Sequence, residues 1–296
     1  MHTAGLHPAA GRPHRGRIMI SSTSNRQIKT IIQLNNKARA RRELRAFVVE
    51  GAKLFSETPA ALIEKVYVAE QFLEKEQNRV LLAKSGADYE TVSDCVFAHA
   101  SDTGAPQGIL AVVHMPAYQF SDLLCGERTA LLVLEDIQDP GNLGTMFRTA
   151  EGAGMSGIIM SRHTADLFAP KTVRATMGSI YRVPFYVSDD LRGTVKKLSQ
   201  AGVHTYAAHL GGKCWYDEPD YTHPSAFLIG NEGNGLAEET AACADTLVKI
   251  PMEGRLESLN AGVAAGIFMY EAYRQRRALT RGQTTERKSL CVSGLK

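Results

Sequence analysis

The stretch NLGTMFRTAEGAG, residues 142–154, follows an apolar run, LLVLE near Leu131, and a turn, DPG at 139–141. Apolar residues recur in it at i, i+3, i+4 and i+7, which predicts an amphipathic helix with Asn142 as its N-cap. A buried strand that ends in such a turn before a helix is the position at which open α/β sheets bind ligands. We therefore expect a ligand cleft here.

A second stretch, LIGNEGNGL at 228–236, has the same strand-then-loop character. The strand ends at Gly230, and the glycines that follow allow backbone atoms to approach a ligand closely. Glu232 in this loop either faces the cleft or is a turn residue in solvent. Spacing alone leaves both interpretations open.

A third stretch, IPMEGRLESLN at 250–260, leaves a strand and enters a helix. We expect Ser258 to cap a helix that begins with Leu259 and Asn260. Val263, Ile267 and Tyr270 then share one helix face. The free N–H groups at such a helix start favour an anionic or electron-rich ligand atom.

Apolar, β-rich runs alternate with helix-like segments through the C-terminal half, which predicts a mainly parallel sheet covered by helices on both faces. A smaller α/β pattern precedes it. The predicted divisions are a disordered extension at 1–20, a small α/β domain at 21–115, a linker at 116–128, the larger domain at 129–279 and a basic tail at 280–296.

Charge is distributed unevenly although the net charge is only +3. Residues 25–45 hold seven basic residues and one acidic residue, and a second basic run closes the chain with Arg274, Arg276, Arg277, Arg281, Arg287 and Lys288. Basic segments of this kind are typical of contact with a phosphate backbone. A solvated helix face is the alternative interpretation.

Several classes of protein are disfavoured. The five cysteines are scattered without a Cys-x-x-Cys pair, so we expect no disulfide framework, no metal site and a reducing, cytoplasmic location. No apolar run is long enough for a membrane helix. Gly152, Gly154 and Gly157 fit the dinucleotide fingerprint but follow a helix, which is the wrong order for a nicotinamide dehydrogenase.

Together the three stretches resemble, in order, the three motifs of the SpoU (TrmH-like) branch of the SPOUT RNA methyltransferases. The resemblance covers about Leu131 to Gln275, and NNKARARRELRAFVVEGAKLF at 35–55 is similar to the small substrate-binding domain that precedes the catalytic domain in many of these enzymes. It implies S-adenosyl-L-methionine as methyl donor, a ribose 2′-hydroxyl in RNA as acceptor, a C-terminal trefoil knot and a homodimer.

The resemblance also implies roles for individual residues. The expected donor contacts are Gly230, Ile250 and Leu259, with Ala208 and His209 as further adenosine contacts. The expected reaction-site residues are Asn142, Arg148, Glu232, Ser258 and Asn260. The expected RNA contacts come instead from the basic segment and are Lys37, Arg39, Arg41, Arg42 and Arg45. Arg148 is the family's activator of the hydroxyl, and a guanidinium, which does not easily lose its proton, suits stabilisation of negative charge better than base catalysis.

The two-domain layout favours 23S ribosomal RNA as the substrate, by analogy with bacterial enzymes that act on it. A transfer RNA is the alternative substrate. The alternative class of function is a non-catalytic RNA-binding protein that assists ribosome assembly. The presence of all five reaction-site residues argues against that class. One departure from the expected pattern is Gly262, where a small polar residue is expected.

Overall fold

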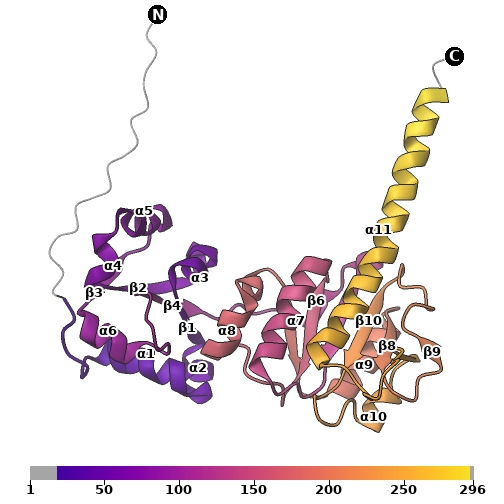
Figure 1. Cartoon of the computed structure of the whole chain (residues 1–296), viewed down its shortest axis with the longest axis horizontal. Helices are drawn as coiled ribbons and strands as arrows, with labels where there is room; N and C mark the ends of the chain where they lie inside the picture. The colour runs from indigo at the N-terminus through magenta and orange to yellow at the C-terminus, as the bar shows by residue number, and fades with distance from the viewer. Residues whose placement is uncertain (1–18, 294–296) are drawn as a thin grey trace, which may run out of the picture. The chain divides into compact units, whose positions relative to one another are not determined.

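The computed structural model describes the backbone of residues 19–293 and the side chains of residues 19–279. It divides into two compact units, Met1–Met115 and Pro116–Lys296, each with one sheet (Figure 1). Within the described part of the chain, no helix combines the length and apolar character needed to cross a membrane. The extension predicted to be disordered lies outside the described residues except at its end, where Ile20 is buried and pairs with Val92. Ile20 therefore belongs to unit 1.

Unit 1 has a four-stranded sheet in the order β1-β4-β2-β3. Its strands are β1 (Ala46–Glu50), β2 (Ile63–Ala69), β3 (Tyr89–Val92) and β4 (Ile109–His114). Its helices are α1 (Arg26–Asn36), α2 (Ala38–Leu44), α3 (Ala52–Glu57), α4 (Glu70–Glu74), α5 (Glu76–Ser85), α6 (Asp94–Ala100) and the 3-10 turn η1 (Ala60–Leu62). β4 pairs antiparallel with β1 and β2, whereas β2 and β3 are parallel. Helix α1 buries Ile28, Ile31 and Leu34, which lie along one face.

Unit 2 has a seven-stranded sheet in the order β7-β6-β5-β10-β8-β11-β9. Its strands are β5 (Ala130–Leu134), β6 (Gly157–Ser161), β7 (Phe185–Ser188), β8 (His204–Ala208), β9 (Cys214–Trp215), β10 (Ser225–Ile229) and β11 (Thr246–Lys249). Its helices are α7 (Pro140–Ala153), α8 (Pro170–Thr176), α9 (Leu191–Gln200), α10 (Glu238–Ala241) and α11 (Ala261–Ser293), with 3-10 turns η2 (Phe120–Leu123), η3 (Gly126–Arg128) and η4 (Ser179–Tyr181). Every pair of neighbouring strands in it is parallel.

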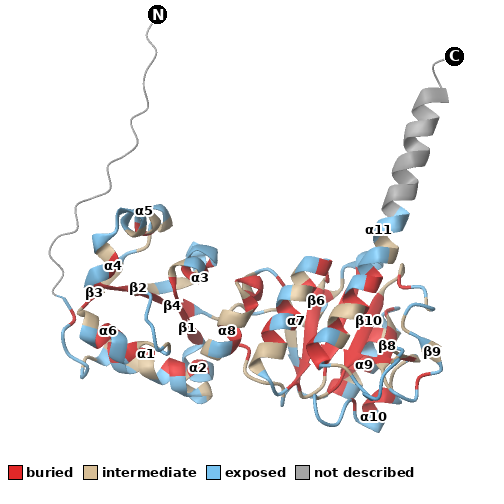
Figure 2. Cartoon of the chain, in the orientation of Figure 1, coloured by how far each residue is buried: buried red, intermediate tan, exposed pale blue. Residues whose placement is uncertain are grey.

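Helices cover both faces of this sheet. On one face, Val195 and Leu198 of α9 pack into a core with Val133 of β5 and Leu228 of β10. On the other face, Phe268 of α11 stacks on Phe227 of β10 at 5.8 Å between ring centroids. The central strands β5, β6 and β10 are buried along their whole length, as Figure 2 shows. The predicted α/β class with a mainly parallel sheet is confirmed, and the trefoil knot stays a prediction.

The structure adds detail to two predicted divisions of unit 2, whose bounds stay a prediction. Residues 116–128 are not a free linker, because Leu123 is fully buried in the core of unit 2 and Tyr118, Phe120 and Leu124 pack against it. In the segment predicted to be a basic tail, the backbone of α11 continues as a helix to Ser293.

The start of α7 also differs from the prediction. Its N-cap is Asp139 rather than Asn142, because the fixed backbone angle of Pro140 suits the first helical position. The Asp139 carboxylate accepts a hydrogen bond from the Asn142 N–H at 2.8 Å. The Asn142 side chain is thereby released from a capping role.

Candidate active site

The loops that follow β8, β10 and β11 surround a cavity of about 500 Å³ at the carboxyl edge of the sheet in unit 2. The predicted site residues on its wall are Ala208, His209, Gly230, Glu232, Ile250, Ser258 and Leu259. Asn142, Arg148 and Asn260 do not line it. All five residues predicted to contact the methyl donor therefore share one cavity.

At Gly230 the backbone that follows β10 packs directly against the backbone of residues 235 and 236. A Cβ atom added to Gly230 would lie 2.0 Å from both Gly235 C and Leu236 N. The loop between them is closed by reciprocal hydrogen bonds of 3.0 Å and 2.9 Å between the backbones of Asn231 and Gly235. Only glycine fits at position 230, so this wall of the cavity is made of backbone rather than of side chains.

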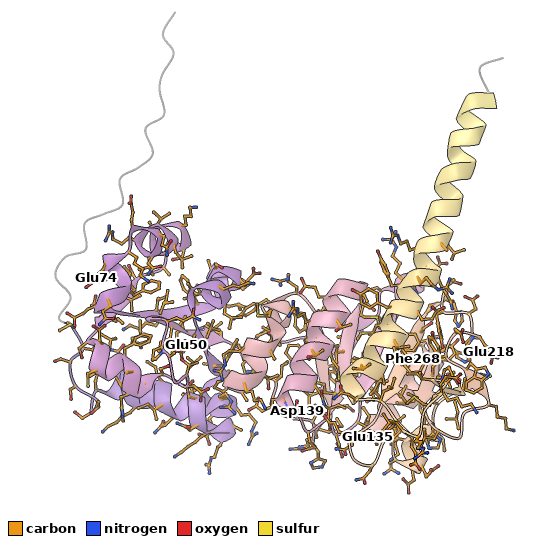
Figure 3. The ribbon with its side chains drawn as sticks, in the orientation of Figure 1. Glu50, Glu74, Glu135, Asp139, Glu218 and Phe268 are labelled. Carbon is orange, nitrogen blue, oxygen red and sulfur yellow. The ribbon has the colours of Figure 1, made fainter. Side chains whose placement is uncertain are left out.

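Polar side chains anchor the same loop to the end of β5. The Asn231 amide donates to the Asp136 carbonyl at 2.7 Å. The Glu135 carboxylate accepts from the Ala237 N–H at 2.8 Å and from the Thr240 hydroxyl. Figure 3 labels Glu135 and Asp139 at this end of unit 2. The sequence analysis did not single out Glu135 or Asn231, although both adjoin the motif strands.

A chain of hydrogen bonds joins the three loop-and-helix stretches beside the cavity. The Asn142 amide donates to Glu232 Oε1 at 2.9 Å, and Asn142 Oδ1 accepts from the Asn260 amide at 3.0 Å. Two backbone N–H groups, those of Gln138 and Asp139, donate to the same carboxylate at 3.0 Å and 3.1 Å. Glu232 therefore faces the β5–α7 loop, which answers the question that its spacing left open.

The environment of Glu232 favours its charged form. Partial burial acts to raise the pKa of this carboxyl, but hydrogen bonds from the Asn142 amide and from backbone N–H groups outweigh it and hold the pKa below the usual value. An ionised carboxylate only accepts hydrogen bonds. It fixes the Asn142 amide with its N–H side toward Glu232 and its oxygen toward Asn260.

Asn260, not Ser258, caps α11. Its Oδ1 accepts from the N–H groups of Gly262 and Val263 at 2.9 Å and 3.2 Å, so the helix begins at Ala261. The prediction for Ser258 was wrong because α11 starts two residues later than the periodicity indicated. Ser258 instead lies exposed on the cavity wall.

The helix face that carries Val263 and Tyr270 is not the buried face of α11. Val263 and Tyr270 are 52% and 50% exposed, and the buried residues of the helix instead include Ala265, Phe268 and Met269. The glycines of α11 explain the choice of face, because Gly262 and Gly266 lie against α7. A Cβ at Gly262 would be 3.2 Å from Asn260 Oδ1 and 3.6 Å from Asn142 Oδ1. The glycine there thus leaves room for the Asn142–Asn260 contact.

Arg148 lies on the exposed face of α7. Leu143, Met146 and Phe147 fill the opposite, buried face. Among the residues whose side chains are described, none forms a hydrogen bond or ion pair with Arg148. Its guanidinium therefore remains available to a ligand outside the cavity, whereas the cavity wall itself does not include it.

His209 is held by two polar partners at the end of β8. Its Nδ1 accepts from the Gly211 N–H at 3.1 Å, and its Nε2 lies 3.3 Å from Glu238 Oε1. These contacts orient the ring, while the turn after it comes close to β11. A Cβ at Gly212 would be 2.8 Å from the Val248 carbonyl carbon. This close packing fixes the turn after His209 against β11.

The basic segment of unit 1 is divided between surface and interior. Lys37, Arg39, Arg42 and Arg45 are exposed, and Arg39 forms an exposed ion pair with Glu43. Arg41 is only 5% exposed, and its guanidinium donates to the carbonyls of Leu34 and Asn35 at 2.6 Å and 3.1 Å. The prediction of Arg41 as an RNA contact was therefore wrong, since its donors satisfy the end of α1.

The basic residues near the end of the chain also include one, Arg276, that binds other parts of the protein. Arg276 donates to the carbonyl oxygens of Arg128, Thr129, Tyr221 and His223, all at 2.8–3.1 Å. It fixes α11 to the loops at the amino edge of the sheet and is not a free surface charge. Arg281, Arg287 and Lys288 lie outside the residues whose side chains are described. Across residues 19–279, no group of three or more His, Cys, Asp and Glu side chains is arranged to hold a metal ion.

Comparisons with known proteins match both units. Residues 129–270 match the SpoU rRNA Methylase family, and residues 25–111 match the MRM3-like substrate binding domain. The 23S rRNA (guanosine(2553)-2'-O)-methyltransferase RlmP of Bacillus subtilis is 33% identical over 252 residues, which are 85% of this chain and 97% of that protein.

Two solved structures share the fold over most of the chain. The AdoMet-bound rRNA methyltransferase from Sinorhizobium meliloti is 33% identical with a TM-score of 0.75, over 86% of this chain and 97% of that one. The SpoU methyltransferase AviRb from Streptomyces viridochromogenes, in complex with AdoMet, is 28% identical with a TM-score of 0.76, over 85% and 98%.

Proposed function

Because this chain belongs to the SpoU rRNA methylase family, we propose that it transfers a methyl group from S-adenosyl-L-methionine to a ribose 2′-hydroxyl of 23S ribosomal RNA. The observation that carries this proposal is the cavity at the carboxyl edge of unit 2, with the Asn142–Glu232–Asn260 chain beside it. We propose that the protein acts in the cytoplasm, where an RNA substrate of this kind is found.

The cavity fits the methyl donor. Gly230 lies on its wall, and a side chain at this position would collide with the backbone of Gly235 and Leu236 and displace that wall. Val248, Ile250 and Leu259 give the cavity an apolar surface on which an adenosine can lie, while charged residues such as Lys249 and Glu257 line other parts of its wall.

 When bound, the donor supplies an electrophilic methyl group on its sulfonium. Ala208, His209, Gly230, Ile250 and Leu259 are the residues that we propose to hold it, largely through backbone atoms.

The acceptor hydroxyl is a poor nucleophile while it is neutral, so negative charge that develops on its oxygen must be stabilised. We assign this role to Arg148, whose exposed guanidinium is the partner-free cation on the helix that carries Asn142. Glu232 and Asn260 orient the Asn142 amide from its two sides, and Asn142 in turn orients the acceptor ribose. Ser258 lies at the cavity wall beside this network.

A homodimer is part of the proposal. Val263, Tyr270 and Tyr273 form an exposed apolar stripe on α11, opposite the face that packs on the sheet. Such a stripe supports burial against a second copy of the chain. The mass of the full chain measured by light scattering tests this point, and a monomer at micromolar concentration would contradict it.

The test of the proposed activity is methyl transfer to unmodified 23S rRNA, with transfer RNA as a second substrate. We expect Arg148→Ala to lower kcat by about a hundredfold or more, as loss of charge stabilisation does. Donor affinity, measured by calorimetry, should change less than about threefold, because Arg148 does not line the cavity. Methylation of transfer RNA alone would show that the substrate is transfer RNA rather than 23S rRNA. Donor binding without methyl transfer to either RNA would favour a non-catalytic RNA-binding protein.

A further inference from the structure

The order of the strands separates two sides of the carboxyl edge in unit 2. The loops that line the cavity follow β8, β10 and β11, whereas the Asn142–Glu232 hydrogen bond spans β5 and β10. β6 lies on the far side of β5 from β10. The loop after β6 and the start of α8 therefore lie on the side of β5 opposite to the cavity.

The loop after β6 is fixed before any RNA binds. The Ser161 hydroxyl accepts from the Asp136 N–H at 2.8 Å and donates to Asp136 Oδ1 at 2.6 Å. The Gln138 amide donates to the His163 carbonyl at 2.8 Å, and the Ala165 N–H donates to the Ile137 carbonyl at 2.7 Å. These bonds hold the β6–α8 loop against the β5–α7 loop as one platform.

Helix α8 is held equally firmly against α7. A Cβ added to Gly144 of α7 would lie 2.3 Å from the Cβ of Ala175 in α8, so the two helices touch through small residues. Gly144 is one helical turn before Arg148. The side chains at the start of α8 therefore have a fixed position relative to the helix that carries Asn142 and Arg148.

Lys171 is the cation at that position. Its Nζ lies 3.7 Å from Asp139 Oδ2, and its side chain is 67% exposed. The Asp139 N–H donates to Glu232 Oε1 at 3.1 Å. Asp139 therefore contacts both Lys171 and the Asn142–Glu232–Asn260 chain of hydrogen bonds. Exposed ion pairs of this length contribute little to stability. The Lys171 ammonium can therefore leave Asp139 and bind a more highly charged anion with little loss of stability.

We propose that Lys171 binds a backbone phosphate of the RNA strand next to the acceptor ribose, and so sets where that ribose lies relative to Asn142 and Arg148. The inference rests on the proposed function. A lysine ammonium is a compact point charge that suits a phosphate, and a phosphate contact fixes position without reading sequence. The competing explanation is that Lys171 only stabilises Asp139 as the cap of α7.

The test compares Lys171→Gln with Lys171→Arg, and with Lys196→Gln as the matched loss of an exposed lysine, on α9. Binding of unmodified 23S rRNA transcript is measured without donor at several salt concentrations. We expect Lys171→Gln to weaken binding about three- to tenfold and to reduce the slope of log K against log salt by about 0.7, the value for one phosphate on a single strand. Lys171→Arg should retain the wild-type slope, and Lys196→Gln should leave it unchanged.

Asp139→Asn separates the two explanations, since asparagine still caps a helix but no longer attracts Lys171. A wild-type salt slope in this variant, together with a raised KM for RNA and unchanged donor affinity in Lys171→Gln, supports the inference. An unchanged salt slope in Lys171→Gln overturns the inference, and so does an equal loss of RNA affinity and slope in Asp139→Asn. Methyl transfer by the wild-type chain would in either case still support the proposed function. A wild-type chain that binds no rRNA would overturn both.

Discussion

The loop after β10 and the loop after β6 lie at the same edge of one sheet but are built from different groups. Close backbone packing shapes the first, where Gly230 touches the backbone of Gly235 and Leu236, although Asn231 and Glu232 also anchor this loop through their side chains. Side-chain hydrogen bonds form the second, where Ser161 and Gln138 join it to the β5–α7 loop. The difference teaches that the first loop should be intolerant of added atoms, and the second of lost polar groups.

The largest effect should come from Gly230→Ala. Its Cβ would overlap backbone that cannot rotate away, so we expect a loss of about 3 kcal/mol or more in the free energy of unfolding. Donor affinity should fall by about a hundredfold, because the overlap displaces the cavity wall. Thermal melting and calorimetry with S-adenosyl-L-methionine measure the two effects.

Gly233→Ala is the matched control, since its Cβ would meet only Asn231 Oδ1 at 3.4 Å. We expect its donor affinity to stay within about threefold of wild type. Equal losses in both variants would show that the loop is sensitive to glycine replacement in general and would break the contrast with the loop after β6.

Parallel topology explains why much of this edge was predictable. Strand ends of a parallel sheet meet at one edge, so three separated motif stretches predict one site, and Gly230, Ile250 and Ala208 indeed share a cavity. The fold class follows from the same alternation of strands and helices and is confirmed. The roles of these residues toward a ligand stay a prediction.

Exposure and capping were not predictable in the same way. Arg41 and Arg42 are adjacent and carry the same charge, yet only Arg41 is buried, because the carbonyl groups at the end of α1 lie within its reach. Asn260 and Ser258 are both good caps, and the two-residue difference depends on how α11 packs against α7. Tertiary contacts decide such choices, and the local sequence does not contain them.

An intermediate effect is expected from Ser161→Ala in the loop after β6. The change removes a buried hydroxyl that pairs with both the N–H and the carboxylate of Asp136, a residue with a positive φ of 52°. We expect a loss of about 1–3 kcal/mol in the free energy of unfolding. Donor affinity should change less than about twofold, since neither residue lines the cavity.

Urea denaturation followed by the fluorescence of Trp215 measures this loss in unit 2, because Trp215 is the single tryptophan of the chain. Ser199→Ala is the control, since its hydrogen bond to Asp245 is exposed, and it should cost less than about 0.5 kcal/mol. A large fall in donor affinity in Ser161→Ala would show that the two loops are not independent.

The smallest effect concerns the carboxylate that joins the two loops. Hydrogen bonds hold the pKa of Glu232 below its ordinary value of 4.5 in the folded chain. A carboxyl with a lowered pKa in the folded state stabilises that state above the unfolded pKa, and the contribution is lost as pH falls through the folded pKa. Wild type should therefore exceed Glu232→Gln in stability at pH 7, and the difference should shrink below about pH 4.5.

Because Glu232 is largely exposed, the difference at pH 7 should stay below about 1 kcal/mol. Glu239→Gln removes an exposed carboxylate of the neighbouring helix α10 and provides the control, with no such pH-dependent difference expected. If the Glu232→Gln difference persisted unchanged at pH 3, the charge of the carboxylate would not be what joins the β10 loop to Asn142. The shape of the side chain would then be responsible, and the acceptor side would depend on packing as much as the donor side does.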